Sequence, residues 1–258
     1  MSEGPRRPPR PAGSSRGPAT EPFQLAAVLF DMDGTLLATE QYWDQALVEL
    51  AAEWGTTVSA QALAATTGMS LGSAMRLVHA DVGVERTPAE QGADARRVER
   101  RVADLMAAGI SWQPGARDLL TACRSAGVRT ALVTTTPRAL VEVVLGHLRR
   151  DLGAEPFDTT VCGDEVPARK PDPAPYTQAM ETLGLGPADC VVVEDSLAGT
   201  TAGLAAGCRV LAVPGAQVLS PVPGLTVRPG LDDVGVQDLR DLPQPSRSST
   251  SIGASAQS

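Results

Sequence analysis

The sequence predicts an α/β fold in which a mostly parallel sheet core carries an inserted α-helical segment. Short apolar runs, typical of strands buried on both faces, alternate with amphipathic helical patterns over residues 23–37 and 111–242. Residues 38–110 interrupt this alternation because they contain only helical patterns. Repeated strand–helix–strand units are typical of a parallel sheet with helices on both faces, which is the architecture we expect.

The first strand is predicted at Leu25–Phe30, where the run LAAVLF is apolar throughout and stops at Asp31. Later strands are predicted at Thr130–Val133, Val191–Val193 and Arg209–Val213, which are also apolar runs. Thr159–Cys162 is a weaker candidate because it carries more polar residues. Their shortness and lack of alternation indicate a sheet that is covered on both faces.

The helices of the core are predicted between these strands, where apolar residues recur at helical spacing. A Pro near a start and a Gly just past an end support several of the boundaries. The predicted core helices are Ala116–Ser125, Ala139–Leu148, Pro175–Leu183 and Leu197–Ala206.

The stretch 38–110 is too long for a simple crossover connection, so we predict a separate helical cap between the first two strands. Its linkers are expected at Leu37–Thr39 and Gly109–Gln113. The predicted cap helices are Tyr42–Trp54, Ala60–Thr66, Gly72–His79 and Pro88–Ala108.

Both ends of the chain differ from the middle. Residues 1–22 contain six Pro and four Arg, and residues 243–258 are rich in Ser. Neither segment has enough apolar surface to offset the entropy of ordering it, so both are predicted to be disordered tails.

The composition excludes several classes of function. A net charge of −8 does not suit sequence-independent binding of nucleic acid, which needs Lys and Arg to neutralise phosphates. No run of 18 apolar residues is present, so no membrane span is expected. The four Cys form no paired motif and sit among apolar residues, which favours reduced, buried thiols and a cytoplasmic location.

Polar side chains follow the predicted strands where their carboxyl ends should meet. In open parallel sheets ligands bind at this edge. The side chains in question are Asp31 and Asp33 in the run DMDGT, Thr134, Lys170, Glu194 and Asp195. Carboxylates hold a hard divalent cation such as Mg²⁺, and a hydroxyl and an ammonium hold the oxygens of a phosphate. One carboxylate can then attack phosphorus, which predicts an aspartyl-phosphate intermediate.

These residues form four motifs in chain order: the DMDGT run that starts at Asp31, then Thr134, then Lys170, and last the pair Glu194-Asp195. The four motifs resemble those of the haloacid dehalogenase-like hydrolases, mainly the phosphatases with a small helical cap. The resemblance covers about residues 25–240 and includes the β-phosphoglucomutase-like and phosphoglycolate phosphatase-like members. It implies a Rossmann-like core and makes Asp31 the nucleophile. Asp33 would protonate the leaving oxygen and then activate water.

The same resemblance implies the remaining site. Mg²⁺ would be bound by Asp31, the backbone carbonyl of Asp33 and Asp195, with Glu194 as a direct or water-mediated ligand. Thr134 and Lys170 would bind the phosphoryl oxygens, assisted by backbone N–H groups of the loop that contains Gly34.

The cap is expected to close over the site and to select the substrate. Candidate residues for substrate contact are Glu40, Trp43, Gly68, Arg76 and Arg138. Core packing is the alternative role for Trp43, and a solvated surface charge is the alternative for the two arginines.

We therefore predict a Mg²⁺-dependent phosphatase that acts on a small phosphorylated metabolite, as a monomer or a dimer. One alternative is a β-phosphoglucomutase-like sugar-phosphate mutase, although those proteins carry a His at the position of Trp43. A true dehalogenase would lack Asp33. A non-catalytic binding protein on this scaffold would usually have lost a catalytic acid, and none is lost here. Ala38 also departs from relatives that have Asp at that position.

Overall fold

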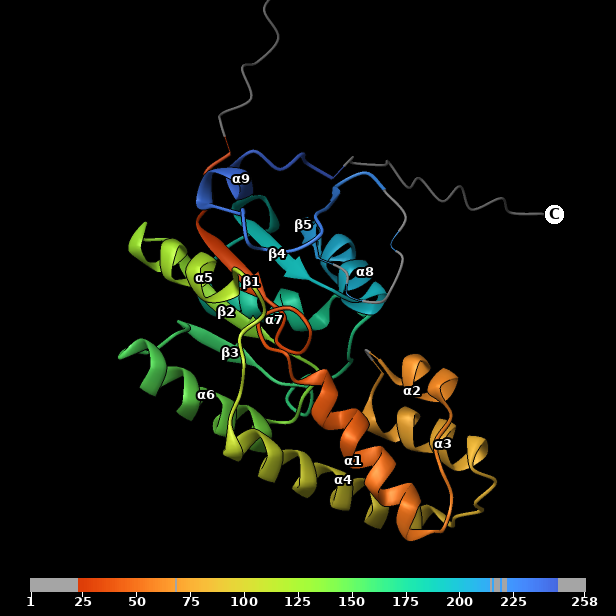
Figure 1. Ribbon diagram of the computed structural model, residues 1–258. Helices are drawn as coiled ribbons and strands as arrows, with labels where there is room; N and C mark the ends of the chain where they lie inside the picture. The colour runs from red at the N-terminus through yellow and green to blue at the C-terminus, as the bar shows by residue number, and fades with distance from the viewer. Residues whose placement is uncertain (1–22, 68, 214, 216–218, 220–221, 246–258) are drawn as a thin grey trace, which may run out of the picture.

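The computed structural model describes residues 23–67, 69–213, 215, 219 and 222–245, and its centre is a parallel sheet with strand order β3-β2-β1-β4-β5-β6 (Figure 1). The five predicted strands are confirmed within two residues. The strands are β1 (Ala27–Phe30), β2 (Arg129–Val133), β3 (Thr159–Val161), β4 (Cys190–Glu194), β5 (Arg209–Ala212) and β6 (Leu225–Val227). The sequence pattern missed β6 because this edge strand has only three residues and is partly exposed.

Helices cover both faces of the sheet because successive strand residues point to opposite sides. Val28 and Phe30 belong to the apolar cluster that includes α5, α6 and α9, whereas Ala27 and Leu29 belong to the cluster that includes α7 and α8. These helices are α5 (Ala116–Ser125), α6 (Arg138–Leu152), α7 (Ala174–Leu183), α8 (Leu197–Ala205) and α9 (Val236–Arg240). A 3₁₀ turn, Pro187–Asp189, precedes β4.

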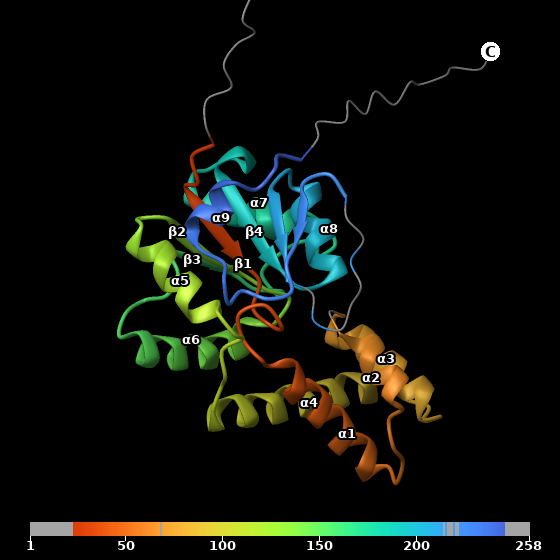
Figure 2. The same cartoon turned by 45° about the horizontal axis from the view of Figure 1, so that its top comes forward.

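Four helices lie between β1 and α5 in the chain and gather beyond the carboxyl ends of the strands (Figure 2). They are α1 (Glu40–Glu53), α2 (Ala60–Thr66), α3 (Leu71–Asp81) and α4 (Pro88–Ala108). Their buried residues join the same apolar cluster as α5 and α6, so the sheet and these helices share packed surface.

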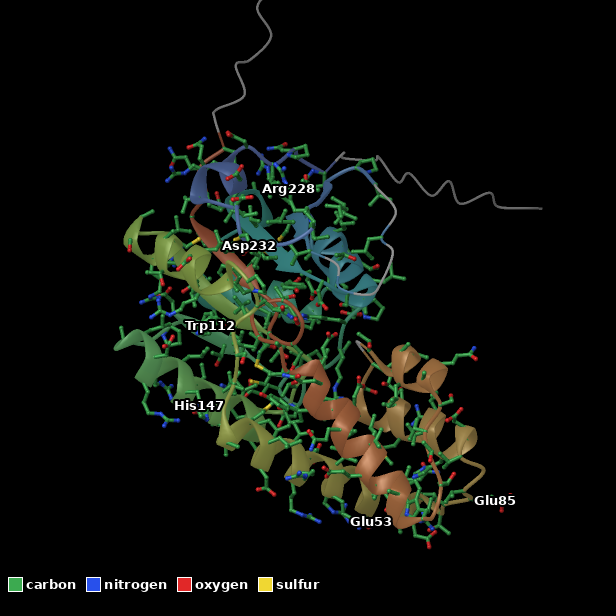
Figure 3. All side chains as sticks on the ribbon, viewed as in Figure 1. Glu53, Glu85, Trp112, His147, Arg228 and Asp232 are labelled. Carbon is green, nitrogen blue, oxygen red and sulfur yellow. The ribbon has the colours of Figure 1, made fainter. Side chains whose placement is uncertain are left out.

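The two connections between the sheet and these four helices run side by side. Leu37 forms an antiparallel bridge with Trp112, and the N–H of Ala38 donates to the carbonyl of Ser111 at 2.9 Å. The Trp112 indole, labelled in Figure 3, donates to Asp151 at the end of α6 at 3.0 Å. This pairing ties the start of α1 and the end of α4 to one point of the core.

Residues 1–22 and 246–258, which belong to the predicted tails, lie outside the described residues. Within the described part of the chain, no helix has the length and apolar character needed to cross a membrane. The four cysteines are buried and unbridged, as predicted: Cys123, Cys162, Cys190 and Cys208.

Candidate active site

The parallel register brings the motif residues together. Phe30 at the end of β1 pairs with Leu132 of β2 and with Val193 of β4. The next residue, Asp31, therefore emerges beside Glu194, and its N–H donates to the carbonyl of Val193 at 3.0 Å. The site predicted at the carboxyl edge of the sheet thus forms from three adjacent strands.

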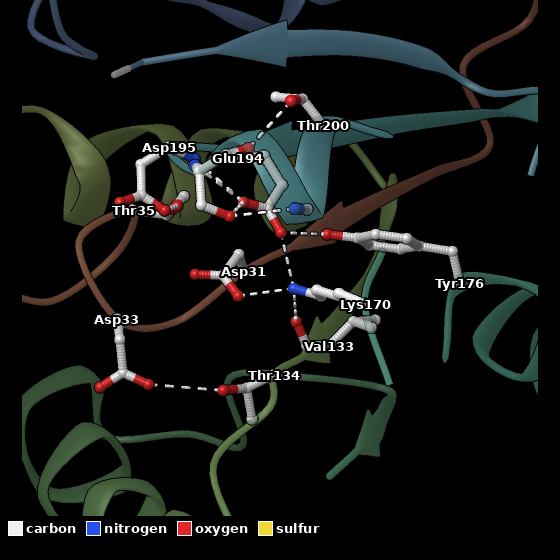
Figure 4. Close-up of polar contacts among 12 residues, drawn as sticks. Asp31, Asp33, Thr35, Val133, Thr134, Lys170, Tyr176, Glu194, Asp195 and Thr200 are labelled. Atoms are coloured by element: carbon white, nitrogen blue, oxygen red, sulfur yellow. Dashed lines mark hydrogen bonds and ion pairs between the residues drawn. The ribbon is translucent and has the colours of Figure 1, made fainter. Parts of the chain in front are cut away.

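Asp31 and Lys170 form a buried ion pair (Figure 4). The Lys170 ammonium donates to Asp31 Oδ1 at 2.6 Å, to Glu194 Oε1 at 2.6 Å and to the carbonyl of Val133 at 2.8 Å. Burial alone would lower the pKa of Lys170, but the two carboxylates outweigh it and raise that pKa above its ordinary value. Burial raises the pKa of Asp31, and Glu194 adds to the rise while Lys170 opposes it.

Glu194 is fully buried, and its two oxygens accept five hydrogen bonds. Oε1 accepts from Lys170 and from the Tyr176 hydroxyl at 2.7 Å. Oε2 accepts from the N–H of Asp195 and from both the N–H and the hydroxyl of Ser196. A Cβ at Gly199 would lie 1.7 Å from Glu194 Oε1, so only glycine leaves room for this carboxylate.

Asp195 lies on the other side of Asp31 and binds the Thr35 hydroxyl through Oδ1 at 3.1 Å. Burial, together with repulsion from Glu194 and Glu40, raises the pKa of Asp195 to about 8. Gly34 has φ +82°, and a Cβ there would lie 2.3 Å from Asp195 Oδ2 and 3.1 Å from Glu40 Cδ. The N–H of Gly34 donates to Leu37, so the structure gives this glycine a conformational role and shows no free N–H for phosphate at that residue.

Asp33 is held by side chains from three segments. Its Oδ1 accepts from the Thr39 hydroxyl and, at 3.5 Å, from the Trp43 indole. Its Oδ2 accepts from the hydroxyls of Thr136 at 2.7 Å and Thr134 at 3.4 Å. The carboxylate therefore has a defined orientation that depends on the β1–α1 linker.

The residues present fit a hard divalent cation. Ligand oxygens of Asp31, Glu194 and Asp195 all lie within 4.8 Å of one another, and these three side chains are buried. Lys170 is the only ammonium hydrogen-bonded to them among the described residues. Asp31 Oδ2 and Asp195 Oδ2 accept no hydrogen bond from the described chain, so they remain available to an oxygen-seeking ion.

A cavity of about 260 Å³ opens over these carboxylates, between the sheet and the inserted helices. Glu40 and Trp43, both predicted substrate residues, line it, as do Thr135 and Thr136, whereas the buried Thr134 does not. The remaining wall comes mainly from Asp44, Leu47, Thr66, Thr67, Met69, Leu71, Gly72, Ala74, Ala95 and Glu99.

The other three predicted substrate residues do not join the described site. Gly68 lies outside the described residues. Arg76 is exposed on α3, where it donates to the Ser73 hydroxyl, and it does not line the cavity. Arg138 also lies off the cavity, because Glu165 accepts two hydrogen bonds from its guanidinium. For these two arginines the structure corresponds to the alternative role of an ordinary surface or ion-paired charge.

Several residues of the site carried no sequence signal of their own. Tyr176 lies in the first turn of α7, in a pattern that indicates only a core position, and Asp44 and Glu99 resemble ordinary charges on helices. Thr35 and Thr39 lie close to the DMDGT run, but their partners depend on the folded arrangement.

Comparison with known proteins decides the family. A family model described as haloacid dehalogenase-like hydrolase matches residues 25–207. The chain belongs to the haloacid dehalogenase-like hydrolases. The matched range contains all four motifs and the whole helical insertion, so the resemblance inferred from the motifs is confirmed.

Named relatives within this family are similar over most of their length. Protein CbbY of Rhodobacter capsulatus is 33% identical over 199 residues, covering 74% of this chain and 86% of the relative. Hexitol phosphatase B of Escherichia coli K12 is 32% identical over 197 residues, covering 75% of this chain and 85% of the relative. The crystal structure of CbbY from Rhodobacter sphaeroides in complex with phosphate superposes with a TM-score of 0.69 at 28% identity, covering 84% of this chain and 99% of that one.

Proposed function

We propose that this hydrolase is a Mg²⁺-dependent phosphatase that releases phosphate from a small phosphorylated metabolite through an aspartyl-phosphate on Asp31. The observation that carries the proposal is the buried Asp31–Lys170 pair at the floor of the cavity, with Asp33 held nearby by hydroxyl groups. Relatives named hexitol phosphatase and, in Thermotoga maritima, phosphorylated carbohydrates phosphatase support a sugar or polyol phosphate as the substrate class.

In the first half-reaction an oxygen of Asp31 attacks phosphorus, and the bond between phosphorus and the leaving oxygen breaks. Asp33 gives its proton to that leaving oxygen. Lys170, already at 2.6 Å from Asp31, neutralises charge as the phosphoryl group transfers. Because burial raises the pKa of Asp31, this ammonium also helps to keep the attacking carboxylate ionised.

In the second half-reaction Asp33 takes a proton from water, and the resulting hydroxide attacks the phosphorus of the aspartyl-phosphate. The bond between phosphorus and Asp31 then breaks, which releases inorganic phosphate and restores the carboxylate. Thr39 and Thr136 hold Asp33 on the cavity side of β2 through both halves. Thr135 and Thr136 line the cavity and would bind phosphoryl oxygens, whereas Thr134, which does not line it, would act through its hydrogen bonds to Asp33 and from the N–H of Thr136.

Asp31, Asp195 and the backbone carbonyl of Asp33 would hold the metal. Glu194 would act mainly by fixing Lys170 and the start of α8, since both of its oxygens are already hydrogen-bonded. When bound, Mg²⁺ offsets the negative charge of the phosphate and of Asp31, which lets two anions approach each other.

We further propose that residues 38–110 act as a cap on a core formed by residues 23–37 and 111–242. The helices of this segment supply one wall of the cavity, and the paired linkers place their attachment next to Asp33. Closure of such a wall would exclude water until the aspartyl-phosphate has formed.

The test is phosphate release from a panel of small phosphomonoesters, with and without Mg²⁺, by wild type and Asp31→Asn. We expect Mg²⁺-dependent release that falls by about 10³-fold or more in the variant, because the nucleophile is lost. Asp104→Asn on the exposed side of α4 is the matched control and should behave as wild type.

Two results would contradict the proposal. Near-wild-type release by Asp31→Asn would exclude this carboxylate as the nucleophile. Conversion of a sugar phosphate to its positional isomer without net phosphate release would show a mutase instead, despite Trp43 at the position where those enzymes carry His.

A further inference from the structure

The wall of the cavity that faces away from the sheet is acidic. Helix α1 presents Glu40, Trp43, Asp44 and Leu47 to the cavity, which is the spacing of one helical face. Helix α4, which packs against α1, adds Glu99. Three carboxylates therefore surround the space above the reacting groups, where the non-phosphate part of a substrate must sit.

Two of these carboxylates are unpaired. Neither Asp44 nor Glu99 forms a hydrogen bond or an ion pair with another residue that the structure describes, although both are partly buried. Burial raises the pKa of Asp44, and burial together with Asp33 and Asp44 raises that of Glu40. Asp44 and Glu99 therefore keep carboxylate oxygens that no described residue occupies.

The same helices do contain arginines, but these lie away from the cavity. Arg97 and Arg101 of α4 pair with Glu53 and Glu49 of α1 in a separate groove between the two helices. Helix α4 thus turns its acidic Glu99 toward the cavity and these arginines toward α1.

The cations that do line the cavity both belong to the sheet side. Lys170 is occupied by Asp31 and Glu194. Arg169 is exposed and donates through Nε to the carbonyl of Gly163 at 2.7 Å, in the loop that follows β3. Within the described lining, the wall formed by α1–α4 contains no Lys or Arg.

We propose that the substrate's leaving group carries no second anionic group, and that it is a neutral polyhydroxylated chain or one bearing an ammonium. This inference rests on the proposed phosphatase function. Unpaired carboxylates accept hydrogen bonds from hydroxyls and attract an ammonium, whereas they repel a carboxylate or a second phosphate at close range. The Trp43 and Leu47 side chains complete the wall with apolar surface for the carbon skeleton.

The test compares phosphomonoesters that differ only in one terminal group. Sorbitol 6-phosphate and 6-phosphogluconate are one pair, and glycerol 3-phosphate and 3-phosphoglycerate are a shorter one. In each pair the first compound ends in a hydroxymethyl group (the neutral member) and the second in a carboxylate (the anionic member). We expect kcat/KM for the neutral member to exceed that for the anionic member by at least about 10-fold. An equal or higher value for the anionic members would overturn the inference and leave the phosphatase function intact.

Variants then locate the origin of the discrimination. Asp44→Asn combined with Glu99→Gln should reduce the neutral-to-anionic ratio of kcat/KM by about 5-fold or more. Glu85→Gln, at an exposed position off the cavity, is the matched control and should leave the ratio unchanged. An unchanged ratio in the double variant would show that these two carboxylates do not cause the discrimination, which would overturn the inference.

A binding measurement separates failure of this inference from failure of the proposed function. The affinity of Asp31→Asn for both members of each pair is measured by calorimetric titration in the presence of Mg²⁺. Weaker binding of the anionic members supports the inference even if wild type releases no phosphate. Equal or tighter binding of those members overturns it, whatever the activity.

Discussion

Thr39 shows how a single side chain links the inserted helices to the chemistry. It occupies the N-cap position of α1, where a Thr hydroxyl ordinarily accepts a hydrogen bond from the first turn. Here no such capping bond forms, and the hydroxyl donates to Asp33 instead. The proposed acid–base carboxylate is therefore oriented by the residue at which α1 begins.

Replacing Thr39 by Val should lower kcat by about 10-fold, because Asp33 loses one hydroxyl that positions it for proton transfer. Thr39→Ser keeps the hydroxyl and should retain most of the activity. Separate measurement of kcat and KM gives a readout that a purely structural role would not produce, since Thr39→Val should lower kcat with little change in KM while Thr39→Ser restores kcat. Equal losses of kcat in both variants would show that Thr39 does not position Asp33.

At the scale of elements, α4 is the longest helix described and carries one wall of the cavity. Its start has a reciprocal capping box, in which Thr87 and Glu90 each accept a hydrogen bond from the other's backbone N–H. Pro88 follows at the first helical position, where its missing N–H has no cost. Buried Val98, Val102 and Met106 then anchor the helix against the shared core.

Thr87→Ala should reduce the free energy of unfolding by about 1 kcal/mol, because the first turn of α4 loses a capping acceptor. Urea unfolding measures this loss. Thr87→Ser, which keeps the hydroxyl, should stay close to wild type. If both variants matched wild type, the capping box would not contribute to the stability of the folded chain.

At the scale of the whole molecule, both described ends pack against the same strand. Arg209 at the start of β5 stacks over the Phe23 ring at 3.5 Å and donates to the carbonyl of Leu242 at 3.0 Å. Leu242 is itself 9% exposed. Pro245 lies close enough that a Cβ on Gly224 would come within 2.7 Å of it. The C-terminal tail predicted from residue 243 thus begins beside residues that contact the core.

Removing residues 1–20 and 246–258 should leave the melting temperature within about 2 °C of that of the full chain, because these segments contain little apolar surface to bury. Removing residues 1–20 and 241–258 takes away Leu242 as well, and should lower the melting temperature by about 4 °C or more. Differential scanning calorimetry of the two truncated chains makes the comparison. A large drop in the first would contradict the prediction that the outer segments are dispensable.

Most elements of the fold were predictable because each leaves a local pattern. The buried strands are continuous apolar runs, and the helices repeat their apolar residues at a spacing that matches their observed bounds, as in α5 and α4. The elements missed, β6 and α9, have three and five residues, which is too short for either period to show. Their positions depend on the sheet edge and on α5 rather than on their own sequence.

The sequence predicts that Asp31, Glu194 and Asp195 meet, because parallel strands place their carboxyl ends at one edge. It could not determine which helical charges face the cavity, since Glu99, Arg76 and Arg138 look alike as solvated charges. The residues that face the cavity, and the contacts of Thr39 with Asp33 and of Tyr176 with Glu194, become visible only in the folded chain. These contacts join segments whose relative placement comes from packing, and local periodicity carries no information about that placement.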